Sequence, residues 1–144
     1  MLAAAIFLED PPKFAGVHRT FLQEDGSGKT SRSPQKMSLG NLRGAGVPLS
    51  VPGSRVAVSE GIETGLSVQQ ATGIPTIAAL SAAGMQALIL PARVQEVFIA
   101  AAADEVGLRA ANVAARRWHA EGRRVRIVEP PEGLDFNDLA GSRS

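Results

Sequence analysis

The spacing of apolar residues changes near residue 55. From there on, short apolar runs alternate with segments whose apolar residues recur every three or four positions. Apolar runs are typical of strands buried on both faces, and the wider spacing is typical of helices. The pattern predicts strands at residues 55–59, 74–80, 96–101 and 124–128, and helices at residues 62–72, 83–90 and 104–121. Strands that alternate with helices favour a mainly parallel sheet.

The longest predicted helix has clear end signals and two faces. Asp104 is an N-cap residue at its start, and Gly122 ends it. We expect an inward apolar stripe formed by Val106, Ala110, Val113, Ala114 and Trp118. The outward face is expected to carry Arg109, Arg116, Arg117 and Glu121.

The first fifty residues have a different character. Residues 2–9 and 14–22 are predicted strands, joined by a turn at residues 10–13. Residues 23–46 are poor in large apolar side chains and rich in Gly, Ser and Lys, and within them residues 24–29 are predicted to form a flexible loop. We therefore expect two parts: residues 1–50, an N-terminal β-hairpin and polar loop, and residues 51–144, an α/β domain.

Composition excludes several kinds of site. The 144 residues include no cysteine, so disulfides, thiolate zinc sites and cysteine nucleophiles are excluded. No apolar run approaches the roughly 18 residues of a membrane span, and we expect a cytoplasmic protein without a membrane partner. Net charge is only +1, but residues 109–126 hold six arginines against Glu121 alone. That cluster is either a phosphate-binding surface or a solvated helix face and strand edge.

Acidic residues follow the predicted strands. Glu60 follows the strand at residues 55–59, and Asp104 lies just after the strand at residues 96–101. Residues 130–139 follow the last strand and include Asp135, Asn137 and Asp138. The carboxyl ends of parallel strands share one sheet edge, where open α/β sheets place their sites. Clustered carboxylates without cysteine suggest a divalent cation held by oxygen ligands.

At these residues the chain resembles a known family. A Glu-Gly pair after a strand, an acidic strand end followed by Gly107, and Asp-Phe-Asn-Asp at residues 135–138 resemble the Toprim domain. Within that family, the chain resembles more closely the Toprim module of phage and prophage primase-helicases. It shares with them Gly-Val-His-Arg-Thr-Phe-Leu at residues 16–22 and Ala-Leu-Ser-Ala-Ala-Gly at residues 79–84. The resemblance implies a Toprim (Rossmann-like) fold with a four-stranded, mainly parallel sheet flanked by helices, plus a small N-terminal β element.

The same resemblance implies a DNA primase-like function in the replication of a mobile element. Such a domain performs metal-dependent nucleotidyl transfer, making RNA primers from nucleoside triphosphates on a single-stranded DNA template. Glu60 is then the catalytic residue, as general base or metal ligand. The implied ligands of Mg²⁺ or Mn²⁺ are Glu60, Asp104, Asp135 and Asp138. The implied nucleotide or nucleic-acid contacts are His18, Arg19, Lys29, Lys36 and Asn137. A helicase motor and a zinc-binding module are expected in the full-length protein.

One position departs from the family pattern. The pattern Asp-x-Asp-x-x-Gly, counted back from Gly107, places its second acid at Asp104 and its first at Ala102. Magnesium often binds through one or two carboxylates, so a weakened site remains compatible with this loss. Three explanations stay open: a degenerate member, a site that relies on Asp135 and Asp138, or an introduced alanine. The alternative functions are a catalytically impaired nucleic-acid or nucleotide-binding module and a Toprim-type nuclease.

Each candidate also has a purely structural explanation. Glu60 is an acid at the start of a predicted helix, where the helix dipole favours it. Asp104 is a helix cap, and residues 135–138 form an Asx-rich turn. The basic residues of the first fifty positions are compatible with an ordinary solvated strand and loop.

Overall fold

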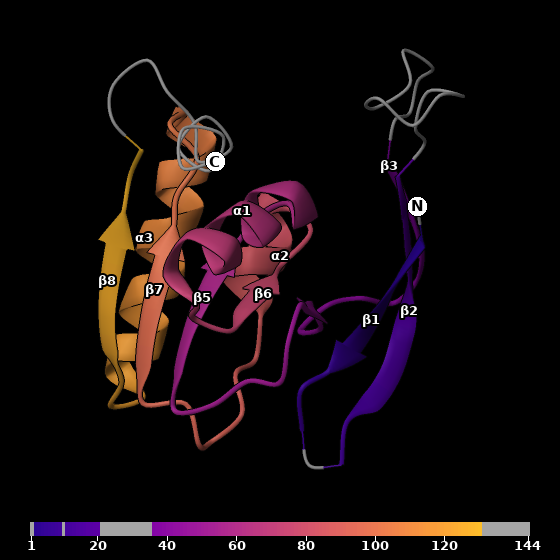
Figure 1. Cartoon of the computed structure of the whole chain (residues 1–144), viewed down its shortest axis with the longest axis horizontal. Helices are drawn as coiled ribbons and strands as arrows, with labels where there is room; N and C mark the ends of the chain where they lie inside the picture. Colours follow the sequence, from indigo (N-terminus) through magenta and orange to yellow (C-terminus); the bar gives the residue numbers. More distant parts are fainter. Residues whose placement is uncertain (1, 10, 21–35, 131–144) are drawn as a thin grey trace.

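The described residues form one five-stranded and one three-stranded sheet (Figure 1). The computed structural model describes residues 2–9, 11–20 and 36–130. The larger sheet comprises β4 (Val47–Pro48), β5 (Arg55–Ser59), β6 (Thr76–Ala78), β7 (Glu96–Ala100) and β8 (Arg124–Val128). Its order is β4-β6-β5-β7-β8, in which only β4 runs antiparallel to its neighbour. The predicted four-stranded parallel arrangement is confirmed, and β4 adds a fifth strand at one edge.

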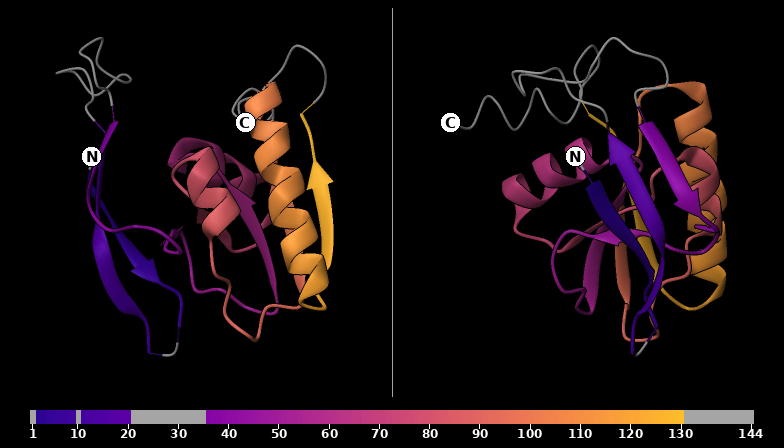
Figure 2. Two further views of the ribbon diagram at one scale, coloured as in Figure 1. Left: turned by 180° about the vertical axis from the view of Figure 1, so that it is seen from behind. Right: turned by 90° about the vertical axis from the view of Figure 1, so that its right-hand side faces the viewer.

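Helices cover both faces of this sheet. They are α1 (Ile62–Thr72), α2 (Ala82–Ala87) and α3 (Glu105–Ala120). In Figure 1, α1 lies in front of the sheet, and the view from behind in Figure 2 shows α2 and α3 on the opposite face. Val56, Val58 and Ile99 pack with Ala114 and Trp118 in the main core behind the sheet. The mixed α/β architecture therefore matches the prediction.

The inward face of α3 differs from the predicted stripe. Ala110, Ala114 and Trp118 are buried as expected, but Val106 is 61% exposed and Val113 is 37% exposed. Gly107 and Ala111 are buried in their place. The prediction was wrong because it favoured large side chains, whereas small residues let the helix approach the sheet closely. A Cβ added to Gly107 would lie 2.7 Å from the Ala102 Cβ.

Arg117 is a second correction on α3. It was predicted to face outward, but its Nη2 donates a hydrogen bond to the Leu88 carbonyl oxygen at 2.5 Å. Trp118 Nε1 donates to the same oxygen at 3.3 Å. Burial lowers the pKa of the Arg117 guanidinium. Arg117 is therefore part of the packing between α3 and the segment after α2.

The N-terminal part forms a small antiparallel sheet. Its strands are β1 (Leu2–Phe7), β2 (Lys13–Thr20) and β3 (Lys36–Gly40), in the order β1-β2-β3. β3 lies in the polar segment at residues 23–46, where no strand was predicted, and it adds a third strand to the expected hairpin. The predicted loop at residues 24–29 lies outside the described residues. Met37 and Leu39 alternate with polar neighbours, but five such residues are too short a run to distinguish from a loop.

The small sheet is joined to the larger one through β1. Ile6 and Gly46 exchange backbone hydrogen bonds of 2.9 and 3.0 Å. Ala5 and Val47 then share a buried cluster with Ala78 of β6. The expected boundary between residues 50 and 51 stays a prediction. None of the described helices is both long and apolar enough to cross a membrane.

Candidate active site

Glu60 lies directly after β5, at the carboxyl edge of the parallel strands. The Ala79 amide donates to the Ser59 carbonyl oxygen at 2.8 Å, and the Leu80 amide donates to the Glu60 carbonyl oxygen at 2.7 Å. The buried Ser59 hydroxyl donates to the Gly61 carbonyl oxygen at 2.8 Å. Backbone contacts therefore hold Glu60 on both sides and leave its half-buried side chain for other interactions.

The partner of Glu60 has an unusual backbone conformation. Leu80 has a φ of 78°, which among the described non-glycine residues is the one positive value. The left-handed conformation costs a side-chain-bearing residue roughly 1–2 kcal/mol. Such strain persists where surrounding contacts fix it, and it often accompanies functional sites. Here it turns the chain from β6 toward α2 immediately beside Glu60.

A glycine allows α1 to start at this point. A Cβ added to Gly65 would lie 2.6 Å from the Ser59 Oγ and 2.9 Å from the Leu49 Cδ1. Only a residue without a side chain lets the first turns of α1 pack on the end of β5. The N-cap residue is Gly61, whose backbone is extended and which has no side chain to accept a capping hydrogen bond.

A small pocket of about 120 Å³ lies beside Glu60. Its lining residues are Glu60, Thr64, Ala100, Ala101, Ala102, Ala103 and Pro130. Glu60 is the one carboxylate among them. Ala102, the position where the family pattern places an acid, borders the same pocket. The loop after β7 and the end of β5 are therefore brought together, as predicted from the shared sheet edge.

Asp104 has a different environment. It is the exposed N-cap of α3, and its Oδ1 accepts a hydrogen bond from the Gly107 amide at 2.6 Å. The predicted capping is confirmed. Asp104 does not line the pocket beside Glu60. Its role as a metal ligand stays a prediction, with Oδ2 as the oxygen that the cap does not use.

The described residues do not by themselves fit a divalent cation. Within this part of the chain, no three His, Cys, Asp or Glu side chains cluster as metal ligands. One carboxylate, Glu60, borders a pocket otherwise lined mainly by alanine, whereas Mg²⁺ and Mn²⁺ prefer several oxygen ligands. Asp135, Asn137 and Asp138 lie outside the described residues.

The predicted nucleic-acid contacts belong to the N-terminal part. His18 and Arg19 are in β2, where His18 is only 5% exposed and Arg19 is half-buried. Lys36 begins β3, opposite Thr20. Lys29 lies outside the described residues. The binding roles of all four residues stay predictions.

Sequence reasoning missed three contributors to this site. Leu80 holds the Glu60 backbone, Gly65 admits α1, and Thr64 lines the pocket. Thr64 lies in the first turn of α1, shortly after Glu60 in the sequence, and that closeness was a usable signal. No feature of the sequence indicated the left-handed conformation of Leu80, because leucine does not favour that conformation.

Comparisons with known proteins agree with this arrangement. Residues 55–144, more than half of the chain, match the model of the Toprim domain, and residues 1–49 match a domain of unknown function (DUF7146). No curated protein matches the chain significantly.

Two solved structures share the fold. A DNA primase domain from Pseudomonas aeruginosa superposes with a TM-score of 0.59 at 17% identity, over 90% of this chain and 43% of that one. The Aquifex aeolicus primase, with its zinc-binding and RNA polymerase domains, gives 0.64 at 18% identity, over 97% of this chain and 37% of that one. This chain thus spans less than half of either primase chain. Toprim domains generally bind divalent metal ions. The family match, together with the placement of Glu60, shows that the chain belongs to the Toprim domain family.

Proposed function

We propose that this chain is a primase-like Toprim domain that makes RNA primers on single-stranded DNA by metal-dependent nucleotidyl transfer. The observation that carries the proposal is the position of Glu60, held at the end of β5 beside a pocket. The fold that the chain shares with two primase structures supports it. A carboxylate in this place can accept a proton from an attacking hydroxyl within hydrogen-bond reach.

The proposal assigns roles to the remaining predicted residues. Glu60 and Asp104 would hold Mg²⁺ or Mn²⁺ together with Asp135 and Asp138. The last two are needed because the described residues alone supply too few carboxylate ligands. An ion in that place would supply charge stabilisation for the triphosphate. His18, Arg19, Lys29, Lys36 and Asn137 would contact template or nucleotide. Basic side chains of this kind bind nucleic-acid backbone without regard to sequence.

We further propose a mobile-element setting. The runs at residues 16–22 and 135–138, which resemble those of phage primase-helicases, support this setting. The domain would then act in the cytoplasm within a longer protein that carries a helicase motor and a zinc-binding module.

The test is calorimetric titration of Mg²⁺ and Mn²⁺ into the unmodified chain, Glu60→Gln and Ala102→Asp. We expect binding to weaken with Glu60→Gln, which removes a charged ligand. We expect it to strengthen with Ala102→Asp, which restores a carboxylate beside the pocket. No binding in any of the three proteins would contradict the proposal and make the acids structural caps.

A second candidate is a catalytically impaired nucleic-acid or nucleotide-binding module. Two observations favour it: position 102 has no ligand atom, and the Asp104 Oδ1 is engaged in capping. Primer synthesis by Ala102→Asp but not by the unmodified chain would support this candidate. Equal synthesis by both proteins would contradict it.

A further inference from the structure

The arginine cluster at residues 109–126 separates into three groups with different environments. The first group is structural. Arg123 donates from Nε to the Val94 carbonyl oxygen at 2.9 Å and from Nη2 to the Pro91 carbonyl oxygen at 3.1 Å, and it pairs with Glu121. Arg117 binds the Leu88 carbonyl oxygen. These two arginines are engaged in packing and are poorly placed for a ligand.

The second group lies on the outer side of α3. Arg109 and Arg116 are exposed, and Arg109 pairs with Glu105 at 3.6 Å, one helical turn away. An exposed pair of this kind contributes little to stability and leaves the helix surface solvated. This group matches the solvated-face interpretation of the cluster.

The third group lies on the opposite face of the sheet. Val125 and Ile127 of β8 pack toward α3 in the main core. Because side chains alternate along a strand, Arg124 and Arg126 project from the other face. Both are exposed, and the Arg124 side chain is 79% exposed.

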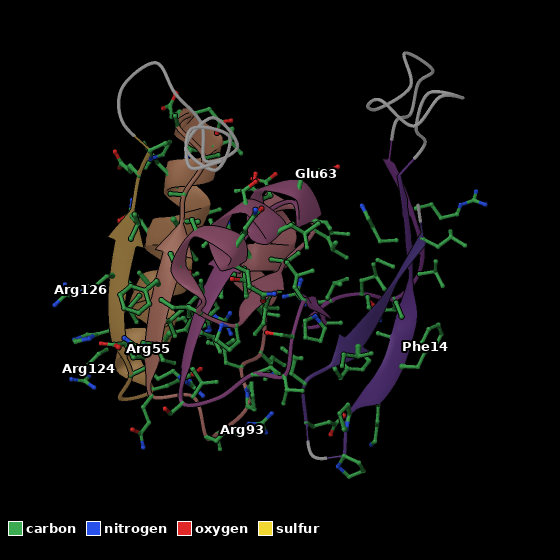
Figure 3. The ribbon with its side chains drawn as sticks, in the orientation of Figure 1. Phe14, Arg55, Glu63, Arg93, Arg124 and Arg126 are labelled. Carbon is green, nitrogen blue, oxygen red and sulfur yellow. The ribbon has the colours of Figure 1, made fainter. Side chains whose placement is uncertain are left out.

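Neighbouring strands extend this group. Across the sheet, Arg55 is opposite Glu96, Glu96 is opposite Arg124, and Phe98 is opposite Arg126. Figure 3 shows Arg55, Arg124 and Arg126 gathered beside β7 and β8. We call these three arginines with Phe98 the basic strip. Glu96 lies between Arg55 and Arg124, its side chain is 21% exposed, and its Oε2 is 3.9 Å from the Arg124 Nε.

Helix α1 leaves this part of the sheet open. It packs on Ala57 and Ala100 through Val68, in a small cluster that Phe98 joins from the side. Most of its contacts are with β5 and β6, whereas Val128 on the same face of β8 is 42% exposed. The basic strip is thus a surface with positive charge and a partly exposed aromatic ring.

The basic strip leads toward Glu60. Ala100, Ala101 and Pro130, at the ends of β7 and β8, line the pocket beside Glu60. Arg126 precedes Pro130 by four residues, which is about 13 Å along an extended strand. Arg124 and Arg126, two residues apart, are separated by about 7 Å, a spacing suited to successive phosphates of an extended strand.

We propose that the basic strip binds the backbone of a single-stranded nucleic acid and directs it to the pocket beside Glu60. Arginines neutralise phosphates and release counterions, and an aromatic ring offers a surface on which bases stack. The identification of the bound strand as a template rests on the proposed function, but the binding itself does not. Binding is independent of sequence, since the strip contacts backbone charge.

The test is the fluorescence anisotropy of a labelled oligo-thymidylate, titrated with the full chain over a series of salt concentrations. The double variant Arg124→Ala/Arg126→Ala is compared with Arg109→Ala/Arg116→Ala, which removes the same charge from the other face. Each lost phosphate contact reduces the slope of log K against log salt by about 0.7 for a single strand. We expect a reduction of about 1.4 for the strip variant and none for the α3 variant.

A further variant and a competitor test whether the change in slope reflects phosphate binding by the strip. Arg124→Lys/Arg126→Lys keeps the charges and is expected to keep the slope, which separates a charge effect from misfolding. Poly-glutamate is expected to compete more weakly than unlabelled oligonucleotide, because it carries negative charge but no bases that could stack on Phe98. Equal slopes for the two alanine variants, or competition by poly-glutamate as strong as by unlabelled oligonucleotide, would overturn the inference.

The same assay separates this inference from the proposed function. Glu60→Gln, measured without metal, is expected to bind the oligonucleotide as the unmodified chain does. Strip-dependent binding without any metal binding would overturn only the proposed function. Metal binding that depends on Glu60, with a salt slope that does not depend on the strip, would overturn only this inference.

Discussion

The ends of β5 and β7 lie side by side but use their acids differently. At the end of β5, the backbone of Glu60 is held by Leu80, and its carboxylate borders a pocket. At the end of β7, Ala102 contributes only a methyl group to that pocket, and Asp104 caps α3. Both ends depend on a helix glycine for close packing, Gly65 in α1 and Gly107 in α3.

The difference shows that, at this sheet edge, the residues that stabilise the fold are not the residues that bring charge to the pocket. The β7 end keeps every feature needed for folding: the cap, the glycine and the close approach of α3. What it lacks is a charged atom directed at the pocket. The residue at position 102 can therefore change without loss of the fold. Glu60 is different, because no other described residue of the pocket lining has a carboxylate that could replace it.

The largest expected effect concerns Glu60. Glu60→Gln should reduce primer synthesis about 100-fold or more, because a positioned general base contributes about 10²–10⁴-fold. The measurement is ribonucleotide incorporation on a single-stranded template. Glu63→Gln, which neutralises an acid in the first turn of α1, is the matched control and should leave the rate unchanged. Equal losses in both variants would point to a general charge effect.

Overpacking tests the glycines at the two strand ends. Gly65→Val and Gly107→Val should each lower the free energy of unfolding by about 1–3 kcal/mol. The new Cβ would lie only 2.6 Å from the Ser59 Oγ in the first variant and 2.7 Å from the Ala102 Cβ in the second. Chemical denaturation measures the loss. Gly53→Val is the control, since no atom lies within 4 Å of a Cβ added there. A loss confined to Gly65 would show that α3 adjusts to the end of β7 more easily than α1 does to β5.

Asp104 distinguishes capping from ligation. Asp104→Ala should lower the free energy of unfolding by about 1 kcal/mol, the usual cost of a lost N-cap. Asp104→Asn, whose side-chain oxygen can still accept from the Gly107 amide, should preserve stability. Thermal unfolding tests both variants, and Mn²⁺ titration of Asp104→Asn then reports any metal role without a change in the cap. Unchanged stability in Asp104→Ala would contradict the capping role.

The smallest expected effect concerns the conformation of Leu80. Leu80→Gly should be more stable than Leu80→Ala by about 0.5 kcal/mol, because release of roughly 1–2 kcal/mol of strain exceeds the entropy cost of glycine. Both variants lose the same apolar contacts and keep the amide that binds Glu60. Denaturant titration measures the difference. The reverse order would show that the left-handed conformation at this position carries no strain.

The parallel core was predictable from local patterns. Apolar runs with Gly73, Pro91 and Gly122 between them placed β5 to β8 and the three helices within a few residues. The type and position of a long element with clear end signals can be predicted from its own residues. β3 was missed because its few residues are ordered by pairing with β2, which lies far back in the chain.

The site was only partly predictable for a similar reason. Glu60 and the neighbourhood of Ala102 follow from motif spacing and the shared sheet edge. The exposure of Val106, the inward turn of Arg117 and the strain at Leu80 depend on contacts between distant segments. Those contacts are set by how closely α3 approaches the sheet, which hydrophobic periodicity does not encode. The roles of Asp135, Asn137 and Asp138 stay predictions.

The carbonyl oxygens between α2 and β7 have an uncommon set of donors. Those of Leu88, Pro91 and Val94 receive hydrogen bonds from Arg117 and Trp118 in the last turn of α3 and from Arg123, which lies between α3 and β8. A connection of this kind cannot become ordered on its own, because buried carbonyl groups need their donors. The segment after α2 and the last turn of α3 should therefore open and close as one cooperative unit, so that their amides exchange hydrogen at a common rate.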